Sequence, residues 1–454
     1  MQIINPATEE MIREIREDDK ITLTEKFNLL KNKQQEWSAT SIRDRVSILQ
    51  NFSSGMETAI ESLSAVLTAE VGKPLQQSRT EINGARARIK WLTENAEKYL
   101  GEEQMNLQSG LEEKISYEPL GVICNISAWN YPWLVGVNVF VSALLAGNSV
   151  MYKPSEYATL TGVEIEKLLK ESGIPDHVFQ LALGGKSVGE ALLDLPFDGY
   201  FFTGSYLTGK YIYEKCASKM VPCQLEMGGK DPLYVADDIS DIPQVAEAAA
   251  DGAFYNNGQS CCSVERIYVH ENIYDEFLLS FKKVVESWKT GAPTEAGVYF
   301  GPLTRKQQLD VLENQVDDAV KKGAQLLMGG KRSIGQGYYF KPAILTHTTH
   351  EMLVMKEESF GPVIGIMRVK NDEEAVHLMA DTEYGLTAAV YTSSRARAEK
   401  ILARLNTGSG YWNCCDRVSA ALPWSGRNHS GFGTTLSRAG MQSFVRPKAW
   451  HLRN

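Results

Sequence analysis

The sequence predicts an α/β protein in which a helical segment precedes two successive parallel-sheet units. Residues from about 23 to 100 carry apolar side chains at helical spacing and few helix breakers. From Gly121 onward, short apolar runs alternate with helical stretches of roughly 10–15 residues, which is typical of strand–helix–strand units around a buried parallel sheet. A second series of this kind follows Lys230. We therefore expect two α/β domains, with their junction near residues 226–231.

The expected strands follow directly from these apolar runs. The first series comprises residues 121–126, 149–152, 178–182 and 199–203. The second series comprises residues 232–235, 266–269, 324–328, 363–366 and 388–391. Residues 112–117 and 444–452 also look extended but lie outside both cores, so we expect them to pair with each other or with another subunit.

Composition and charge exclude several classes of protein. A chain of 454 residues is long enough for two or more cores. The net charge of −9 argues against nonspecific nucleic-acid binding, which needs a basic face. The longest apolar stretch, residues 133–146, is too short and too interrupted to span a membrane.

Cysteine usage and the first residues indicate the compartment. The N-terminus shows no secretory signal pattern, and none of the seven cysteines has the spacing of a zinc site. Seven cysteines in such a chain are typical of reduced thiols. We therefore expect a cytoplasmic protein without a metal centre.

A thiol and a carboxylate stand in two Gly-containing turns. Cys261 ends the run Asn-Asn-Gly-Gln-Ser-Cys, and Glu226 opens the run Glu-Met-Gly-Gly-Lys. This pair suits acyl chemistry, in which the thiol attacks a carbonyl and the carboxylate activates the water that releases the acid. Asn130 follows the first strand of the sheet, where its amide can donate to a developing oxyanion.

The phosphate-binding signals are weaker. The chain has no Gly-x-Gly-x-x-Gly run after a strand, and its Gly-Gly-Lys triplets lack the upstream glycine of an ATP-binding loop. Residues 203–209 place Gly204, Ser205 and Gly209 between a strand and a helix, where a pyrophosphate could bind. Lys153 and Glu156 follow another strand. A capped helix and a surface turn are the alternative interpretations of these two segments.

These motifs, in this order, resemble those of the NAD(P)-dependent aldehyde dehydrogenase superfamily over nearly the full length. The resemblance implies that Cys261 is the nucleophile, Glu226 the general base and Asn130 the side-chain half of the oxyanion hole. The segment 357–362 is similar to a second cofactor motif of that family. The cofactor-binding residues implied by the resemblance are Trp129, Lys153, Glu156, Gly204, Ser205, Gly209, Glu358 and Phe360.

The resemblance also implies an architecture of three parts. Residues 1–104 and 121–226 would form a Rossmann-like NAD-binding domain, and residues 227–433 a second α/β domain that carries the catalytic thiol. Residues 105–120 and 434–454 would form a small β oligomerisation element. A homodimer or homotetramer is the expected assembly.

Cofactor and substrate can be predicted further. Glu156 would accept hydrogen bonds from ribose hydroxyls and repel a 2′-phosphate, which favours NAD over NADP. Asn138 stands where succinate-semialdehyde members often carry an arginine, which disfavours that substrate. Tyr131, Trp133, Trp412 and Trp424 lie in or beside pocket-lining segments, so we expect an apolar or aromatic aldehyde, with core packing as the alternative role of these rings.

Three other functions remain open at this stage. A coenzyme A-acylating aldehyde dehydrogenase would generally lack the base that Glu226 supplies. A cysteine esterase or thioesterase would need a histidine near Cys261, and His270 is the nearest in sequence. A non-catalytic binding protein on the same scaffold would be expected to lose Cys261 or Glu226.

Overall fold

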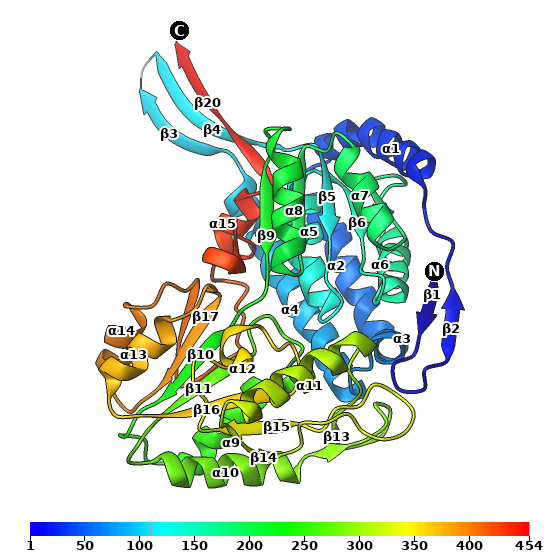
Figure 1. Ribbon diagram of the computed structural model, residues 1–454. Coiled ribbons are helices and arrows are strands. Elements are labelled where there is room, and N and C mark those ends of the chain that lie inside the picture. Colours follow the sequence, from blue (N-terminus) through cyan, green and yellow to red (C-terminus); the bar gives the residue numbers. More distant parts are fainter. Residues whose placement is uncertain (109, 454) are drawn as a thin grey trace.

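The computed structural model describes residues 1–108 and 110–453 (Figure 1). The predicted N-terminal helical segment is confirmed, and local sequence signals set its helix ends. Asp19 caps the first helix in a reciprocal pair with Thr22, and Ser41 caps the second. Gly72, at a φ of 83°, ends the third helix. The four helices are α1 (Lys20–Ala39), α2 (Ile42–Thr58), α3 (Ile60–Val71) and α4 (Leu75–Leu100). A short hairpin of β1 (Gln2–Ile4) and β2 (Met11–Glu14) precedes them.

The first sheet has six strands in the order β19-β9-β8-β5-β6-β7. All its pairings are parallel except that of β19 with β9. Its strands are β5 (Val122–Ile126), β6 (Ser149–Lys153), β7 (Phe179–Leu181), β8 (Gly199–Thr203), β9 (Cys223–Glu226) and β19 (Gly431–Phe432). The helices between them are α5 (Pro132–Leu145), α6 (Thr159–Glu171), α7 (Lys186–Asp194) and α8 (Tyr206–Ala217). The four strands predicted for this series are confirmed, and β9 and β19 are additional.

The second sheet has seven strands in the order β14-β15-β16-β11-β10-β17-β18. Its strands are β10 (Asp231–Val235), β11 (Val264–His270), β14 (Gln325–Met328), β15 (Ala343–Thr346), β16 (Val363–Val369), β17 (Thr387–Tyr391) and β18 (Ser409–Trp412). Its principal helices are α9 (Ile242–Phe254), α10 (Tyr274–Ser287), α11 (Lys306–Lys321), α12 (Leu353–Lys356), α13 (Asp372–Ala380) and α14 (Arg395–Leu402). Figure 1 shows this unit below the first one, with β13 (Val298–Phe300) at its side. β12 (Lys289–Thr290) pairs with β13.

Two features of the second sheet differ from the prediction. β15 and β18 were not predicted, and β14 runs antiparallel to β15 rather than parallel. β18 has the sequence Ser-Gly-Tyr-Trp and lies at the sheet edge with alternating exposure, so it lacks the continuous apolar run of a buried strand.

A third sheet projects from the first unit (Figure 1). It comprises β3 (Glu103–Gln108), β4 (Leu111–Pro119) and β20 (Val445–Arg453), all antiparallel. β4 and β20 pair along their full length, from Val445 opposite Pro119 to Arg453 opposite Leu111. The expectation that these two extended segments pair with each other is therefore confirmed.

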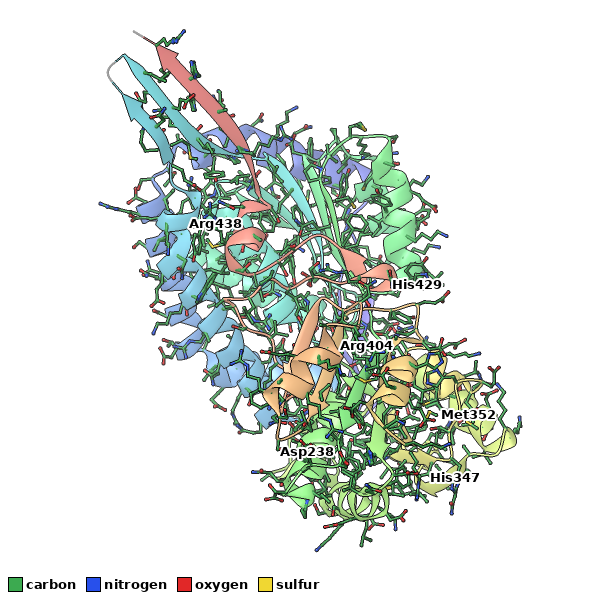
Figure 2. All side chains as sticks on the ribbon, turned by 90° about the vertical axis from the view of Figure 1, so that its left-hand side faces the viewer. Asp238, His347, Met352, Arg404, His429 and Arg438 are labelled. Atoms are coloured by element: carbon green, nitrogen blue, oxygen red, sulfur yellow. The ribbon has the colours of Figure 1, made fainter. Side chains whose placement is uncertain are left out.

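The C-terminal segment returns to the first unit before it reaches the projecting sheet. α15 (Ser437–Gln442) lies at the base of that sheet, where Arg438 is paired with Glu103 at 2.6 Å (Figure 2). Phe444 is fully buried and stacks on Phe201 of β8 at 4.4 Å. Residues 437–445 therefore help to complete the first core. The domain limits given above remain a proposal.

Among the described residues, no helix combines the length and the apolar character needed to cross a membrane.

Candidate active site

Cys261 follows a tightly determined turn between the two units. Asn256 and Asn257 adopt left-handed backbone conformations with φ of 54° and 57°, which asparagine tolerates better than most residues. The Asn257 amide donates to the carbonyls of Gly301 and Pro302 at 3.0 and 2.9 Å. A Cβ on Gly258 would stand 2.5 Å from the Gly361 carbonyl oxygen, so only glycine fits there. The partly exposed thiol of Cys261 is thus presented by a rigid segment.

Asn130 is brought to this turn from the first unit. It lies just before α5, is 4% exposed, and its Nδ2 donates to the Gln259 carbonyl at 3.1 Å. Its own carbonyl accepts from Lys73 Nζ at 2.7 Å and from Asn256 Nδ2 at 3.2 Å. The amide predicted as an oxyanion donor therefore lies beside the thiol-bearing turn.

Glu226 is the last residue of β9 and faces the C-terminal return of the chain. The Thr435 hydroxyl donates to Glu226 Oε1. Burial raises the pKa of Glu226 to about 7, against the smaller lowering effects of Thr435 and the charge of Arg88. A carboxylate with a pKa near neutrality suits a general base.

Gly228 and Gly229, which follow Met227, let the Glu358 side chain and the Cys261 backbone approach this segment closely. A Cβ on Gly228 would lie 2.1 Å from Glu358 Oε1, and one on Gly229 would lie 2.7 Å from the Cys261 carbonyl oxygen. The Gly229 N–H donates to Glu358 Oε1 at 3.1 Å. The two predicted motifs and the 357–362 segment therefore meet at one place.

A buried ion pair supports this meeting point. Lys230 Nζ lies 2.5 Å from Glu265 Oε2, and both side chains are almost fully buried. Glu265 also accepts from the backbone N–H groups of Ser359 and Phe360 at 2.9 and 3.0 Å. Burial and the neighbouring charge of Glu265 raise the pKa of Glu358 to about 8. Glu358 is thus held in position by the second unit.

Two of the expected cofactor contacts lie at the end of β6. Lys153 is 5% exposed, and its Nζ donates only to the neighbouring Pro154 carbonyl, at 3.3 Å, among the residues that the structure describes. Burial lowers the pKa of Lys153, while the charge of Glu156 raises it. Glu156 is partly exposed three residues later. A buried ammonium with unused donors fits a hydroxyl-rich or anionic ligand.

The run 203–209 forms the N-terminus of α8. Ser205 is the N-cap position, but its side chain makes no capping hydrogen bond to the backbone. The first N–H groups of this helix are therefore available to an anion. A Cβ on Gly209 would meet Met227 Sδ at 2.3 Å, so this glycine lets α8 approach the Glu226 strand end, while Gly204 lies against the Phe202 ring.

Aromatic side chains connect the two units on the same side. The rings of Trp129 and Phe360 meet edge to face at 5.4 Å, and Trp129 meets Tyr157 at 6.3 Å. Phe360 adopts a positive φ of 45°, which its backbone hydrogen bond to Glu265 helps to maintain. The expected cofactor residues thus come from both units, and their contacts with a cofactor remain a proposal.

Sequence reasoning missed several residues around this site. Thr435 contacts Glu226, Lys73 and Glu81 form a fully buried ion pair below Asn130, and Arg88 exerts its charge on Glu226. The Gly-Lys-Pro run at 72–74 was an available signal, because a lysine between two predicted helices can be directed inward. The partners of Thr435 and Arg88 are distant in sequence, so no local pattern indicated them.

The described residues include no cluster of three or more His, Cys, Asp or Glu side chains that could hold a metal ion.

Comparisons with known proteins agree with this geometry. The family model described as "Aldehyde dehydrogenase family" matches residues 1–450. Aminoaldehyde dehydrogenase 1, peroxisomal, from Pisum sativum is 33% identical, over 98% of this chain and 91% of the relative. Betaine aldehyde dehydrogenase from Staphylococcus aureus in complex with NAD+ is 29% identical with a TM-score of 0.95, and the match covers 100% of this chain and 91% of that one. 3,6-Anhydro-L-galactose dehydrogenase in complex with NAP is also 29% identical with a TM-score of 0.95, over 100% and 96% of the two chains.

Proposed function

The chain belongs to the aldehyde dehydrogenase family, and on this premise we propose that it oxidises an aldehyde to a carboxylic acid through a thioester on Cys261. The observation that carries the proposal is the meeting of three elements at one point. The rigid Cys261 turn, the Asn130 amide and the Glu226 carboxylate come from different parts of the chain. Each belongs to a different step of the same reaction.

The first step is addition of the Cys261 thiolate to the aldehyde carbon. The carbonyl oxygen becomes an oxyanion, and the Asn130 Nδ2 and the Cys261 N–H are the donors proposed to stabilise it. The Asn130 backbone is held by two hydrogen bonds to its carbonyl and its side chain by one hydrogen bond from Nδ2, so little reorganisation is needed when the charge develops. The chemistry that NAD or NADP would supply when bound is a hydride acceptor, and loss of hydride from the former aldehyde carbon would leave a thioester on Cys261.

Hydrolysis of that thioester is assigned to Glu226. Its carboxylate takes a proton from water, the resulting hydroxide attacks the thioester carbon, and the Cys261 thiolate leaves as the acid forms. A pKa of about 7 lets a large fraction of Glu226 be ionised at neutral pH while keeping it basic enough to accept the proton. Thr435 orients one oxygen of this carboxylate.

The described side chains fit a dinucleotide. The N-terminus of α8, which follows Gly204 and has the N-cap Ser205 without a capping hydrogen bond, suits a pyrophosphate, and the buried ammonium of Lys153 suits ribose hydroxyls. Glu358 and Phe360 would hold the nicotinamide end. Glu156 supports NAD over NADP, because its carboxylate would repel a 2′-phosphate.

The test is NADH formation by the purified protein with a panel of aldehydes, without coenzyme A. Cys261→Ser should abolish NADH formation, and Glu226→Gln should retain a single burst of NADH because only thioester hydrolysis is blocked. Running NADP in parallel, with Glu156→Ala and the exposed Glu171→Ala as its control, tests cofactor choice. Equal activity in the Cys261→Ser protein would contradict the thioester mechanism.

The alternatives are disfavoured by particular contacts. Coenzyme A acylation would not need a base, whereas Glu226 is oriented by Thr435. A hydrolase would need a histidine at Cys261, but His270 lies at the end of β11 with Asp237 at 3.7 Å, and no described histidine is hydrogen-bonded to Cys261. We also retain the cytoplasmic location and a homodimer or homotetramer as proposals, noting that the Pisum sativum relative is named peroxisomal.

The aromatic residues give less support to an apolar aldehyde than their sequence positions suggested. Trp424 is 5% exposed and packs against Cys262, while Trp133 is fully buried in the first core. The indole N–H of Trp412 donates to the Thr392 carbonyl at 2.9 Å. These three rings are held by the protein itself, so the apolar or aromatic substrate rests mainly on Tyr131.

A further inference from the structure

Arg88 of α4 brings a positive charge close to the proposed reaction centre. Its Nη1 donates to Asn138 Oδ1 at 2.8 Å and to the Leu134 carbonyl at 3.3 Å, both on α5. Burial lowers the pKa of Arg88, and the charge of Glu226 is the largest influence that raises it, followed by Cys262, Glu81 and Cys261. The guanidinium is therefore within electrostatic reach of both the thiol and the base.

The guanidinium of Arg88, a partly exposed residue, is incompletely paired, whereas that of the fully buried Arg266 is not. Arg266 donates five hydrogen bonds, four of them to backbone carbonyls and one to the Tyr268 hydroxyl. Arg88 forms no ion pair within 4.0 Å, and its Nε and Nη2 donate to no acceptor, among the residues that the structure describes. A guanidinium has five N–H donors, and its planar fork matches a carboxylate. Three donors of Arg88 thus remain for a ligand.

The position of the Arg88 guanidinium beside α5 sets the length of that ligand. Leu134 and Asn138 follow Asn130 by four and eight residues, and they lie about 3 and 9 Å along the axis of α5 from its first residue, Pro132, at 1.5 Å per helical residue. A ligand whose carbonyl oxygen lies at Asn130 would therefore reach Arg88 with a group several carbon atoms away.

We propose that Arg88 determines substrate specificity by binding a carboxylate at the far end of the aldehyde, so that the enzyme's substrate is an aldehyde acid of about four to six carbons. This inference rests on the proposed aldehyde oxidation. It revises the sequence expectation, because the absence of an arginine at Asn138 is compensated by Arg88, which donates to Asn138 from the neighbouring helix. The fork of Arg88 pairs with the carboxylate and leaves the aldehyde carbon at Cys261.

The carboxylate of Asp416 would disfavour an aldehyde that carries a negative charge. Asp416 accepts from Cys262 Sγ at 2.9 Å, and burial raises its pKa to about 6, so it is mostly ionised at pH 8. A cationic aldehyde, such as an aminoaldehyde, would be favoured by Asp416 and disfavoured by Arg88. Whether the enzyme prefers an anionic or a cationic aldehyde therefore shows whether Arg88 or Asp416 determines its specificity.

The experiment compares three aldehydes of equal chain length that end in a carboxylate, a methyl group or an ammonium group. The kcat/KM of each is measured at pH 8 with NAD for the wild type, Arg88→Met, Arg88→Lys and Arg86→Met. Arg86 is the matched control, because it lies two residues away on α4 and pairs with Glu57 at 2.6 Å. We expect the carboxylate-to-methyl ratio of kcat/KM to fall about 10–100-fold in Arg88→Met, mainly through KM.

The ratio should recover in part in Arg88→Lys and match the wild type in Arg86→Met. The inference is overturned if the wild type prefers the ammonium aldehyde, or if Arg88→Met leaves the ratio unchanged while the methyl aldehyde is still oxidised. If no aldehyde is oxidised, the proposed function fails instead. Calorimetry with a four- to six-carbon dicarboxylate then tests Arg88 separately, since equal affinity for the wild type and Arg88→Met would refute its role.

Discussion

At the scale of single residues, burial sets the chemistry of Glu226. The carboxyl group would have a pKa near 4.5 in an extended chain, and its environment raises that pKa to about 7. The raised value makes ionisation of Glu226 a titratable step within the ordinary working range of an enzyme.

The pH dependence of turnover should report this group. Because only the ionised carboxylate can accept a proton from water, we expect kcat to rise with pH through about 7 and then level off. Glu226→Gln should lower kcat by about 10²–10⁴-fold and remove this rise. The measurement is steady-state NADH formation between pH 5.5 and 9. A rise that persists in Glu226→Gln would assign the titration to another group.

The identities of the main site residues could be predicted from the sequence better than any other feature of the site. Cys261, Glu226 and Asn130 stand in short runs whose glycines and turns are visible without a structure, and the structure brings the three segments together. Thr435 and Arg88 were not accessible in this way. Thr435 lies 209 residues from Glu226, and only the antiparallel return of β19 beside β9 explains why they touch.

At the scale of elements, a buried ion pair fixes α4 relative to α5. Lys73 and Glu81 have fully buried side chains. Lys73 Nζ also donates to the Asn130 carbonyl, and Glu81 Oε1 accepts from the N–H of Trp133 in the first turn of α5. The pair thus anchors the segment that carries the oxyanion donor.

Replacing one member of the Lys73–Glu81 pair should destabilise the protein more than replacing both members. Lys73→Met leaves the Glu81 charge buried and unpaired, which we expect to destabilise the protein by about 3–5 kcal/mol. The double variant Lys73→Met with Glu81→Leu should recover much of that loss but still show a lower kcat, because Asn130 has lost a contact. Denaturant unfolding and steady-state kinetics measure the two effects. Additive losses of stability would show that the residues act independently.

Glu70 stabilises the start of α6 through hydrogen bonds from the backbone of that helix. Glu70 of α3 accepts hydrogen bonds from the N–H groups of Leu160 and Thr161 at 2.8 and 2.7 Å. Burial raises the pKa of Glu70 to about 7, above its ordinary value of 4.5. The folded protein therefore holds a proton here that the unfolded chain releases, over a window from about pH 4.5 to 7.

Stability should consequently fall as pH rises through that window. A pKa difference of this size corresponds to at most about 3 kcal/mol. Glu70→Gln, which cannot ionise, should show a smaller fall in melting temperature between pH 5 and 8 than the wild type. Other buried carboxyls, such as Asp231, contribute equally to both proteins. An identical fall in both proteins would mean that Glu70 is already ionised at pH 5.

Most elements were predictable because their sequence patterns are local. The N-terminal helices and the strands with continuous apolar runs followed from periodicity alone. Of the strands that were missed, β18 and β9 lie at or near sheet edges, and their partly exposed residues dilute the apolar signal. β15 is fully buried but only four residues long, which is too short for a periodic pattern. The antiparallel direction of β14 depends on its pairing with β15, which no local pattern states.

At the scale of the whole molecule, the two units are joined where the reaction is proposed to occur. β9 of one sheet ends at Glu226, and β10 of the other begins at Asp231. Figure 2 shows His429, which stacks on the Tyr206 ring at 3.8 Å, at the boundary between the units. Changes in the angle between the units would therefore alter the spacing of Glu226 and Cys261.

The projecting sheet should govern assembly. β4 is mostly only partly buried and β20 is largely exposed along its length, so a partner subunit is the expected means of covering this sheet. We expect a chain ended after Pro447 to sediment as a smaller species than the full-length protein. Sedimentation velocity tests this, and retained NAD binding would show that the truncated chain is folded. An unchanged assembly would place the subunit contact elsewhere.

The pairing of β19 with β9 has a consequence for biosynthesis. Gly431 lies beside Glu226, although 205 residues separate them in the chain. At a synthesis rate of about 5–20 residues per second, the ribosome takes roughly 10–40 s to deliver the strand that covers this edge. During that interval β9 is an unpaired edge strand of the nascent first unit, because the segment that contains β19 has not yet been synthesised. Folding chaperones that bind extended segments would have their main opportunity to engage this protein in that interval.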